Sequence, residues 1–202
     1  MVSEPTRPSL LLRLRDPADT AAWRDFDQTY RDLILGYCRA RGLQLGDAED
    51  VRQTVMMNLS KAAQGSFEYR PERGRFRNYL ARIVQNAIRR HFSRPNQPPQ
   101  RLGTEMESVL AAPAEDATDA LWEQEWVRHH FRQAMRQVKR DFEPRSVRVF
   151  ERLLDGAPVA AVAAEFQLST QAVHKIKQRI RNRMEEEIAR QVAAEDPPGG
   201  KA

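Results

Sequence analysis

Two stretches of the chain combine cations with amide or aromatic side chains at helical spacing, and this mixture suits a polyanionic partner. The first stretch, residues 169–183, carries five Lys and Arg residues after position 173 and no acid. Such a basic helix can neutralise phosphates while its amides and hydroxyls reach base edges. The side chains that it would offer to DNA are Ser169, Thr170, Gln171, His174, Lys175, Gln178, Arg179 and Arg181.

The second stretch, residues 75–93, mixes arginines with amides and aromatic rings along one expected helix. Cations hold a phosphate backbone, whereas rings and amides stack on or hydrogen-bond unpaired bases. The candidate residues of this stretch are Arg75, Phe76, Asn78, Tyr79, Arg82, Asn86, Arg89 and Arg90. An alternative remains for the two rings, because Phe76 and Tyr79 on a helix can equally belong to the core.

A third set of polar residues lies near the start of an expected helix over residues 47–62. Its members are Asp47, Glu49, Asp50, Gln53, Thr54 and Met57. The simple interpretation of the acids is helix capping and a favourable interaction with the helix dipole. Because these acids are crowded at the start of a helix, capping explains them better than binding of a divalent cation does.

The elements that must position these residues are all helices. Sustained alternation of β-branched residues is almost absent, so the fold is expected to be all-α. Asp19 and Thr20 cap a helix that Gly42 ends, and further helices are expected over residues 75–93, 121–141 and from Pro144 to Gly156.

Residues 157–183 have the pattern of a helix-turn-helix. Apolar residues recur at helical spacing up to Phe166, Gln167 and Leu168 break the pattern, and Ser169 is a suitable N-cap for the basic helix. The apolar seam Val173, Ile176 and Ile180 would dock that helix on the first one. The alternative is an ordinary helical hairpin whose basic face is only solvated.

Composition divides the chain into two small helical domains joined by a flexible linker. Residues 95–120 contain prolines, then a small-residue acidic run without an apolar period, so domains are expected at 10–94 and 121–192. The chain has 202 residues and a net charge of +5, which is consistent with a polyanionic partner but does not require one. A secretory signal and a membrane span are both absent, and the expected location is cytoplasmic.

Residues for catalysis or metal binding are not apparent. The sequence lacks a phosphate-binding loop and the common hydrolase and metalloprotease motifs, so no enzyme, cofactor or metal site is expected. His129 and His130 are adjacent, which is poor metal geometry, and they are expected at the surface or between domains. Cys38 is the only cysteine and is interpreted as a core thiol.

Three segments taken in order resemble the sigma-70 superfamily of bacterial RNA polymerase sigma factors, in the small two-domain extracytoplasmic-function (ECF) class. The segments are DAEDVRQTV at residues 47–55, SFEYRPERGRF at 66–76 and FRNYLARIVQNAIRRHFSR at 76–94. The resemblance implies that the polar set at 47–57 grips the clamp helices of the polymerase β′ subunit. It also implies that residues 75–90 engage the downstream promoter element and its separated non-template strand.

For the second domain, the resemblance implies recognition of the upstream promoter element through residues 169–183 and contact with the β flap. The linker would thread toward the RNA exit channel, and an anti-sigma factor is a possible partner. The match weakens here, because Ala161, Ala172, His174 and Val147 replace residues usual in the family. A rival hypothesis is a helix-turn-helix regulator that binds duplex DNA without polymerase, and a second is a helical scaffold that binds no DNA.

Overall fold

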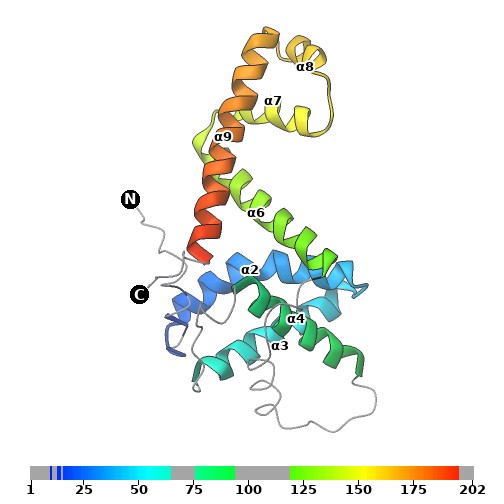
Figure 1. The fold of residues 1–202 in the computed structure, drawn as a ribbon, viewed down its shortest axis with the longest axis vertical. Helices are drawn as coiled ribbons and strands as arrows, with labels where there is room; N and C mark the ends of the chain where they lie inside the picture. The colour runs from blue at the N-terminus through cyan, green and yellow to red at the C-terminus, as the bar shows by residue number, and fades with distance from the viewer. Residues whose placement is uncertain (1–9, 11–12, 15, 65–75, 94–118, 196–202) are drawn as a thin grey trace. The chain divides into compact units, whose positions relative to one another are not determined.

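The computed structural model describes residues 10, 13–14, 16–64, 76–93 and 119–195 (Figure 1). Every regular element in these ranges is a helix, which confirms the all-α prediction. The helices are α2 (Thr20–Ala40), α3 (Leu45–Gln64), α4 (Phe76–Ser93), α6 (Ala120–Asp141), α7 (Pro144–Leu154), α8 (Val159–Glu165) and α9 (Thr170–Glu195). The chain divides into two compact units: unit 1 comprises Met1–Val127 and Ala193–Ala202, and unit 2 comprises Arg128–Val192.

The boundaries of α2 follow from its two ends. The Asp19 carboxylate accepts a hydrogen bond from the Ala22 amide at 2.9 Å, as an N-cap does, and Arg13 holds the same carboxylate at 2.8 Å. At the other end Gly42 adopts a φ of +90°, which an L side chain rarely tolerates. Both signals confirm the helix predicted between Asp19 and Gly42.

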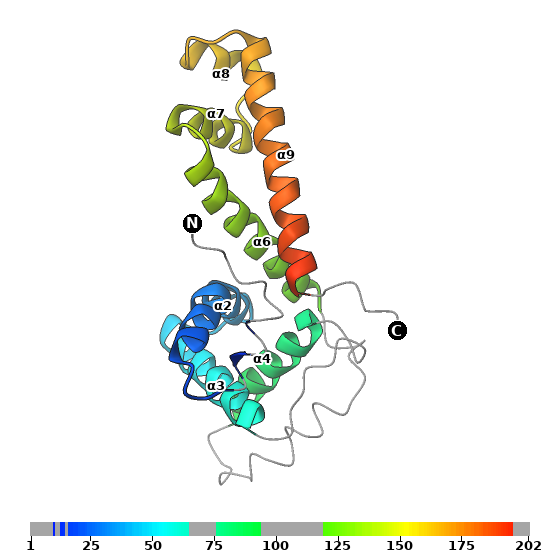
Figure 2. The ribbon, with the colours of Figure 1, turned by 90° about the vertical axis from the view of Figure 1, so that its left-hand side faces the viewer.

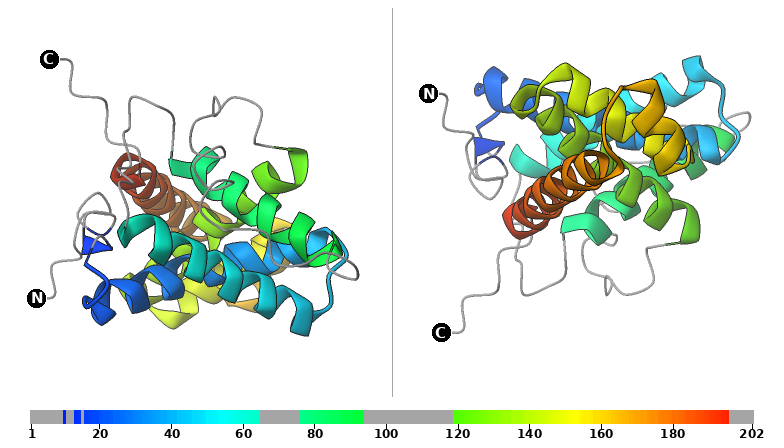
Figure 3. Two further views of the ribbon diagram at one scale, coloured as in Figure 1. Left: turned by 90° about the horizontal axis from the view of Figure 1, so that it is seen from below. Right: turned by 90° about the horizontal axis from the view of Figure 1, so that it is seen from above.

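The core of unit 1 is an aromatic cluster between α2 and α4. The ring of Phe26 lies 4.8 Å from that of Tyr30, and the ring of Phe76 lies 5.4 Å from that of Tyr30, measured between centroids. All three residues are buried. α3 packs against both α2 and α4 (Figures 2 and 3), and it begins at Leu45, two residues before the predicted start.

Cys38 lies in this core, as the sequence predicts. It is fully buried, and burial raises the pKa of its thiol to about 12. The thiol therefore stays protonated and unreactive at neutral pH.

The first turns of α6 also belong to unit 1. Trp122 is fully buried and Trp126 nearly so, and both are part of the unit 1 core. The Trp122 ring meets Tyr37 edge to face, with centroids 5.1 Å apart. A domain predicted to start at residue 121 would hold this whole helix, whereas in the structure its residues up to Val127 belong to unit 1.

Unit 2 contains the remainder of α6 with α7, α8 and most of α9. One core cluster contains Val138, Phe150 and Ile180, and a second contains Val162 and Val173. α8 and α9 are separated by residues 166–169, where Gln167 adopts a φ of +52°. The Ala172 amide donates to the Ser169 hydroxyl at 3.1 Å, so Ser169 caps α9 as predicted.

His129 and His130 are buried, which excludes the surface, one of the two places expected for them. Their side chains are 1% and 4% exposed. A ring nitrogen of His130 lies 2.9 Å from the Gln191 side-chain oxygen on α9, and the Gln133 amide contacts His129. These contacts with side-chain amides offset the cost of burying two polar rings. The adjacency of the two histidines in the sequence does not reveal the amide partners.

Removal of the Trp122 side chain should strongly destabilise unit 1. Trp122→Ala is expected to cost about 3–5 kcal/mol of unfolding free energy, because a large buried ring leaves a cavity. All three tryptophans of the chain lie in unit 1, so urea unfolding followed by tryptophan fluorescence reports on that unit.

The matched control is Val127→Ala, on the same helix but with Val127 66% exposed. This change should stay within about 0.5 kcal/mol of wild type. Equal shifts of the unfolding transition in the two variants would show that the start of α6 is not part of the core.

Candidate nucleic-acid and polymerase interfaces

The outer face of α4 carries a row of amides and arginines. Asn78, Arg82, Asn86 and Arg89 follow one another at spacings of three or four, which places them on one side of the helix. Arg89 is exposed and the other three are half-buried. The guanidinium of Arg89 donates to the Asn86 side-chain oxygen. This row, called the α4 outer face below, could meet phosphates and base edges together.

Two of the aromatic or basic candidates of this stretch stand apart from the α4 outer face. Phe76 is 1% exposed and belongs to the aromatic core, so its ring is not a platform for bases here. Arg75 lies outside the described residues. The alternative considered for Phe76, a place in the core, is the one that the structure shows.

Tyr79 occupies the edge between core and surface. Its ring packs against the unit 1 core and lies 6.3 Å from that of Phe76. Burial raises the pKa of Tyr79, so the phenol stays neutral. Burial also lowers the pKa of the neighbouring Arg82, though an arginine remains charged at neutral pH. A neutral ring beside a partly desolvated cation suits a site for an unpaired base.

Glu49 on α3 is held within the fold. Its carboxylate accepts from Arg52 at 2.7 Å and from Arg31 of α2, and Arg52 also contacts Asp27. The hydrogen bond from Arg31, and then that from Arg52, holds the pKa of Glu49 below its usual value. This network joins α2 to α3, so Glu49 already has a structural role. The sequence reasoning missed Arg52, although its spacing of three from Glu49 is typical of a helical ion pair.

The other acids of the 47–57 set face outward. Asp47 lies 3.4 Å from the His91 ring on α4, while Asp50 and Gln53 are exposed. Met57 is 56% exposed, which is unusual for a large apolar side chain beside charged groups.

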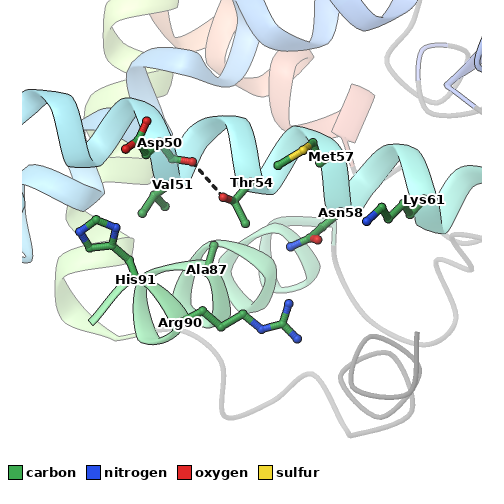
Figure 4. Close-up of a pocket in the computed structure, with 9 residues that line it drawn as sticks. All are labelled: Asp50, Val51, Thr54, Met57, Asn58, Lys61, Ala87, Arg90 and His91. Carbon is green, nitrogen blue, oxygen red and sulfur yellow. Dashed lines mark hydrogen bonds between the residues drawn. The ribbon is translucent and has the colours of Figure 1, made fainter. Parts of the chain in front are cut away.

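A pocket between α3 and α4 lies beside these residues (Figure 4). Its lining consists of Asp50, Val51, Thr54, Met57, Asn58, Lys61, Ala87, Arg90 and His91. The Thr54 hydroxyl donates to the Asp50 carbonyl at 2.9 Å. The acids of α3 and the arginines of α4 are predicted to form two separate surfaces. In the structure, Asp50 of the first set and Arg90 of the second line the same pocket.

The start of α9 presents its polar residues to solvent. Ser169, Thr170, Gln171, His174, Lys175, Gln178, Arg179 and Arg181 are all exposed. Three of them also have contacts within unit 2: Gln178 donates to Asn182 at 2.7 Å, Arg181 lies 3.4 Å from Glu185, and the Arg179 guanidinium stacks 5.7 Å above the Phe142 ring. Lys175 and His174 lie one turn beyond the cap, where a helix would first meet a ligand.

The described ranges offer neither a metal site nor a membrane span. No three His, Cys, Asp or Glu side chains there come together as ligands. Likewise, no helix within them has the length and apolar character needed to cross a membrane.

Comparison with known families identifies the segment that carries α2, α3 and α4. Residues 26–97 match the family model of sigma-70 region 2. The matched segment is therefore similar to region 2 of the sigma-70 family, whose proteins are transcription initiation factors rather than enzymes. Neither curated proteins nor solved structures give a significant match to the chain. Both the α4 outer face and the exposed part of α3 lie within the region 2 segment.

The Glu49 network predicts a pH-dependent contribution to stability. The pKa of Glu49 is lowered on folding, so its contribution is complete above the unfolded value of about 4.3 and is lost as the pH falls through the folded value. Glu49→Gln should therefore cost up to about 1 kcal/mol at pH 7 and progressively less below about pH 4. Urea unfolding across this pH range measures the difference.

The control for this prediction is Glu185→Gln. Glu185 pairs with Arg181 on the surface of α9 and is 66% exposed. Its removal should have little effect on stability at any pH. A cost for Glu49→Gln that does not change with pH would contradict the ion-pair explanation.

Proposed function

We propose that this protein is a sigma factor of the two-domain extracytoplasmic-function class, which binds core RNA polymerase and directs it to a class of promoters. The observation that carries the proposal is the match of residues 26–97 to sigma-70 region 2, over the helices that bear the α4 outer face and the exposed acids of α3. The motifs at residues 47–55 and 76–94, which carry the resemblance to this class, fall within the same segment.

The α4 outer face would bind the downstream promoter element and its separated non-template strand. Arg82 and Arg89 supply cations for the backbone, and Asn78 and Asn86 supply amides for base edges. Tyr79 would support an unpaired base from the edge of the core. Melting would then be driven by binding, since each captured base offsets an unstacking cost of a few kcal/mol. Phe76 would act only by fixing the position of α4.

The exposed residues of α3 would contact the clamp helices of the polymerase β′ subunit. Asp50, Gln53 and Met57 are accessible, and an acid beside an exposed thioether can combine an ion pair with apolar contact. Glu49 would support this surface only indirectly, because its carboxylate already accepts hydrogen bonds from Arg31 and Arg52.

Unit 2 would recognise the upstream promoter element through the start of α9. The cap at Ser169 and the short α8 before it support a helix-turn-helix, in which the first turns of the second helix enter the major groove. The outer surface of the same unit would meet the β flap. The linker, residues 95–120, would thread toward the RNA exit channel, and its residues 95–118 lie outside the described ranges. An anti-sigma factor that masks region 2 would be a partner consistent with this class.

In vitro transcription with purified core polymerase tests the proposal. RNA starts are mapped on a pool of native genomic fragments, with and without the protein. New starts that share a two-part upstream motif would support the sigma function. A folded protein that binds duplex DNA alone but neither binds core polymerase nor creates new starts would instead favour the helix-turn-helix regulator.

Reversal of charge at Asp50 should impair binding to polymerase. Asp50→Arg places a cation on the face proposed to grip the clamp, so the affinity for core polymerase should fall by at least about tenfold, as for a contact worth more than 1.4 kcal/mol. Asp25→Arg on α2 is the control, because Asp25 is also exposed and has only a 3.8 Å ion pair with Arg13. Unchanged affinity for Asp50→Arg would remove this contact from the proposal.

Loss of the Lys175 amine should weaken binding to the upstream element alone. Lys175→Ala removes one phosphate or base contact, which is expected to cost about 1–3 kcal/mol of DNA affinity and leave the affinity for core polymerase unchanged. Lys139→Ala is the control, since Lys139 is an exposed cation of the same unit that pairs with Glu151 at 2.8 Å. Equal losses of DNA affinity in the two variants would indicate a general charge effect.

A further inference from the structure

The methionines of the described ranges differ in their exposure to solvent. Met135 and Met184 are 8% and 6% exposed and belong to a core cluster of unit 2. Met56 is half-buried and packs against the core of unit 1. Met57, in contrast, is 56% exposed. Because an oxidant reaches a thioether most readily where the sulfur is accessible, Met57 is the member of this group that peroxide should attack first.

The one thiol of the chain is protected from the same oxidants. Cys38 is fully buried, and burial raises the pKa of its thiol to about 12, so the reactive thiolate is scarce at neutral pH. The thioether of Met57 reacts without any deprotonation. Within the described part of unit 1, the sulfur most open to oxidation is therefore that of Met57.

Met57 lies on the side of α3 that turns away from the core. Asp50, Met57 and Lys61 follow one another at spacings of seven and four, so they share one side of the helix. Val55 and Leu59 are buried on the opposite side. A polar product at Met57 would therefore leave the core of unit 1 intact.

The surroundings of Met57 can accommodate a sulfoxide. Met57 lines the pocket between α3 and α4 together with the cations Lys61 and Arg90 (Figure 4). A sulfoxide oxygen accepts hydrogen bonds, and the Lys61 ammonium, one turn further along α3, is a donor within helical reach. The oxidised side chain can therefore be hydrated and hydrogen-bonded at the surface of the free protein.

We infer that Met57 is a reversible oxidation site, at which hydrogen peroxide converts the thioether to the sulfoxide and lowers the affinity of the protein for core polymerase. One oxygen atom passes from the peroxide to sulfur: the O–O bond breaks and an S–O bond forms, so the sulfur is oxidised by two electrons and the peroxide is reduced to water. The inference rests on the proposed function, because contact with polymerase is what gives the modification its effect.

The physical reason for the loss of affinity is the polarity of the product. An exposed thioether can contribute apolar contact when the α3 surface binds its partner. A sulfoxide loses that contact, and it must also give up its water when the surface is covered. The oxidised protein should therefore fold as before and bind polymerase less tightly.

Graded oxidation of the purified protein tests the site itself. The protein is treated with hydrogen peroxide, catalase removes the excess, and peptide mass spectrometry measures the oxidised fraction at each methionine. Met57 should be oxidised before Met56, Met135 and Met184, and the urea unfolding transition should stay unchanged. Oxidation of Met57 no faster than that of the other three would overturn the inference.

The affinity for core polymerase, measured before and after this treatment, tests the effect. It should fall by about tenfold, because burial of a methionine side chain contributes enough free energy for a change of that size. Methionine sulfoxide reductases of both stereospecificities, with dithiothreitol, should restore the affinity. Recovery with dithiothreitol alone would assign the effect to Cys38 and contradict the inference, as would an affinity that oxidation of Met57 leaves unchanged.

Two matched variants assign the effect to one position. Met57→Leu keeps an apolar side chain that peroxide does not oxidise, so its affinity, compared with its own value before treatment, should not change. Met56→Leu should remain as sensitive to peroxide as the wild type. The comparison also covers Met1 and Met106, which lie outside the described ranges. A loss of affinity in treated Met57→Leu equal to that of the wild type would rule out Met57 as the site.

Failure of the proposed function would give a different result. If neither the untreated protein nor the untreated Met56→Leu variant binds core polymerase, the proposed function is overturned, and the effect inferred for Met57 with it. If the untreated protein binds and the oxidised protein binds equally well, the inference about Met57 fails and the proposed function stands.

Discussion

Burial of the Phe76 ring is the constraint on which the geometry of unit 1 depends. Phe76 is the first residue of α4, and its ring packs against those of Phe26 and Tyr30 of α2. Once it is fixed, the helical repeat decides the direction of every later side chain of α4. Leu80 and Val84 are then buried, whereas Asn78, Arg82 and Asn86 stay half-buried at the edge of the core. The α4 outer face is therefore a consequence of where one apolar residue is buried.

Helix positions and ends could be predicted because they depend on local chemistry. Asp19, Gly42 and Ser169 each act through their own side chain or φ angle, and each lies where the sequence places it. The all-α fold follows similarly from apolar periodicity. The likeness of residues 26–97 to sigma-70 region 2 could be recognised because its motifs are contiguous in the sequence.

The partner of an apolar stripe could not be predicted in the same way. Periodicity shows that Trp122 and Trp126 are buried, but the same pattern would suit the core of either domain. The choice depends on Tyr37, Arg41 and Gly36 of the α2 region, which are distant from α6 in the sequence, so no local pattern links the two. For the same reason the pairing of Glu49 with Arg31 could not be recognised, because Arg31 approaches it from another helix.

Contacts between distant parts of the sequence decide how far unit 1 extends along α6. The Trp122 ring meets Tyr37 edge to face, and the Asp119 carboxylate accepts from Tyr37 and Arg41 while it also caps the helix. Trp122 and Trp126 belong to the same core cluster as Phe76, the residue that fixes α4. A change at the start of α6 therefore acts on the core that positions the α4 outer face.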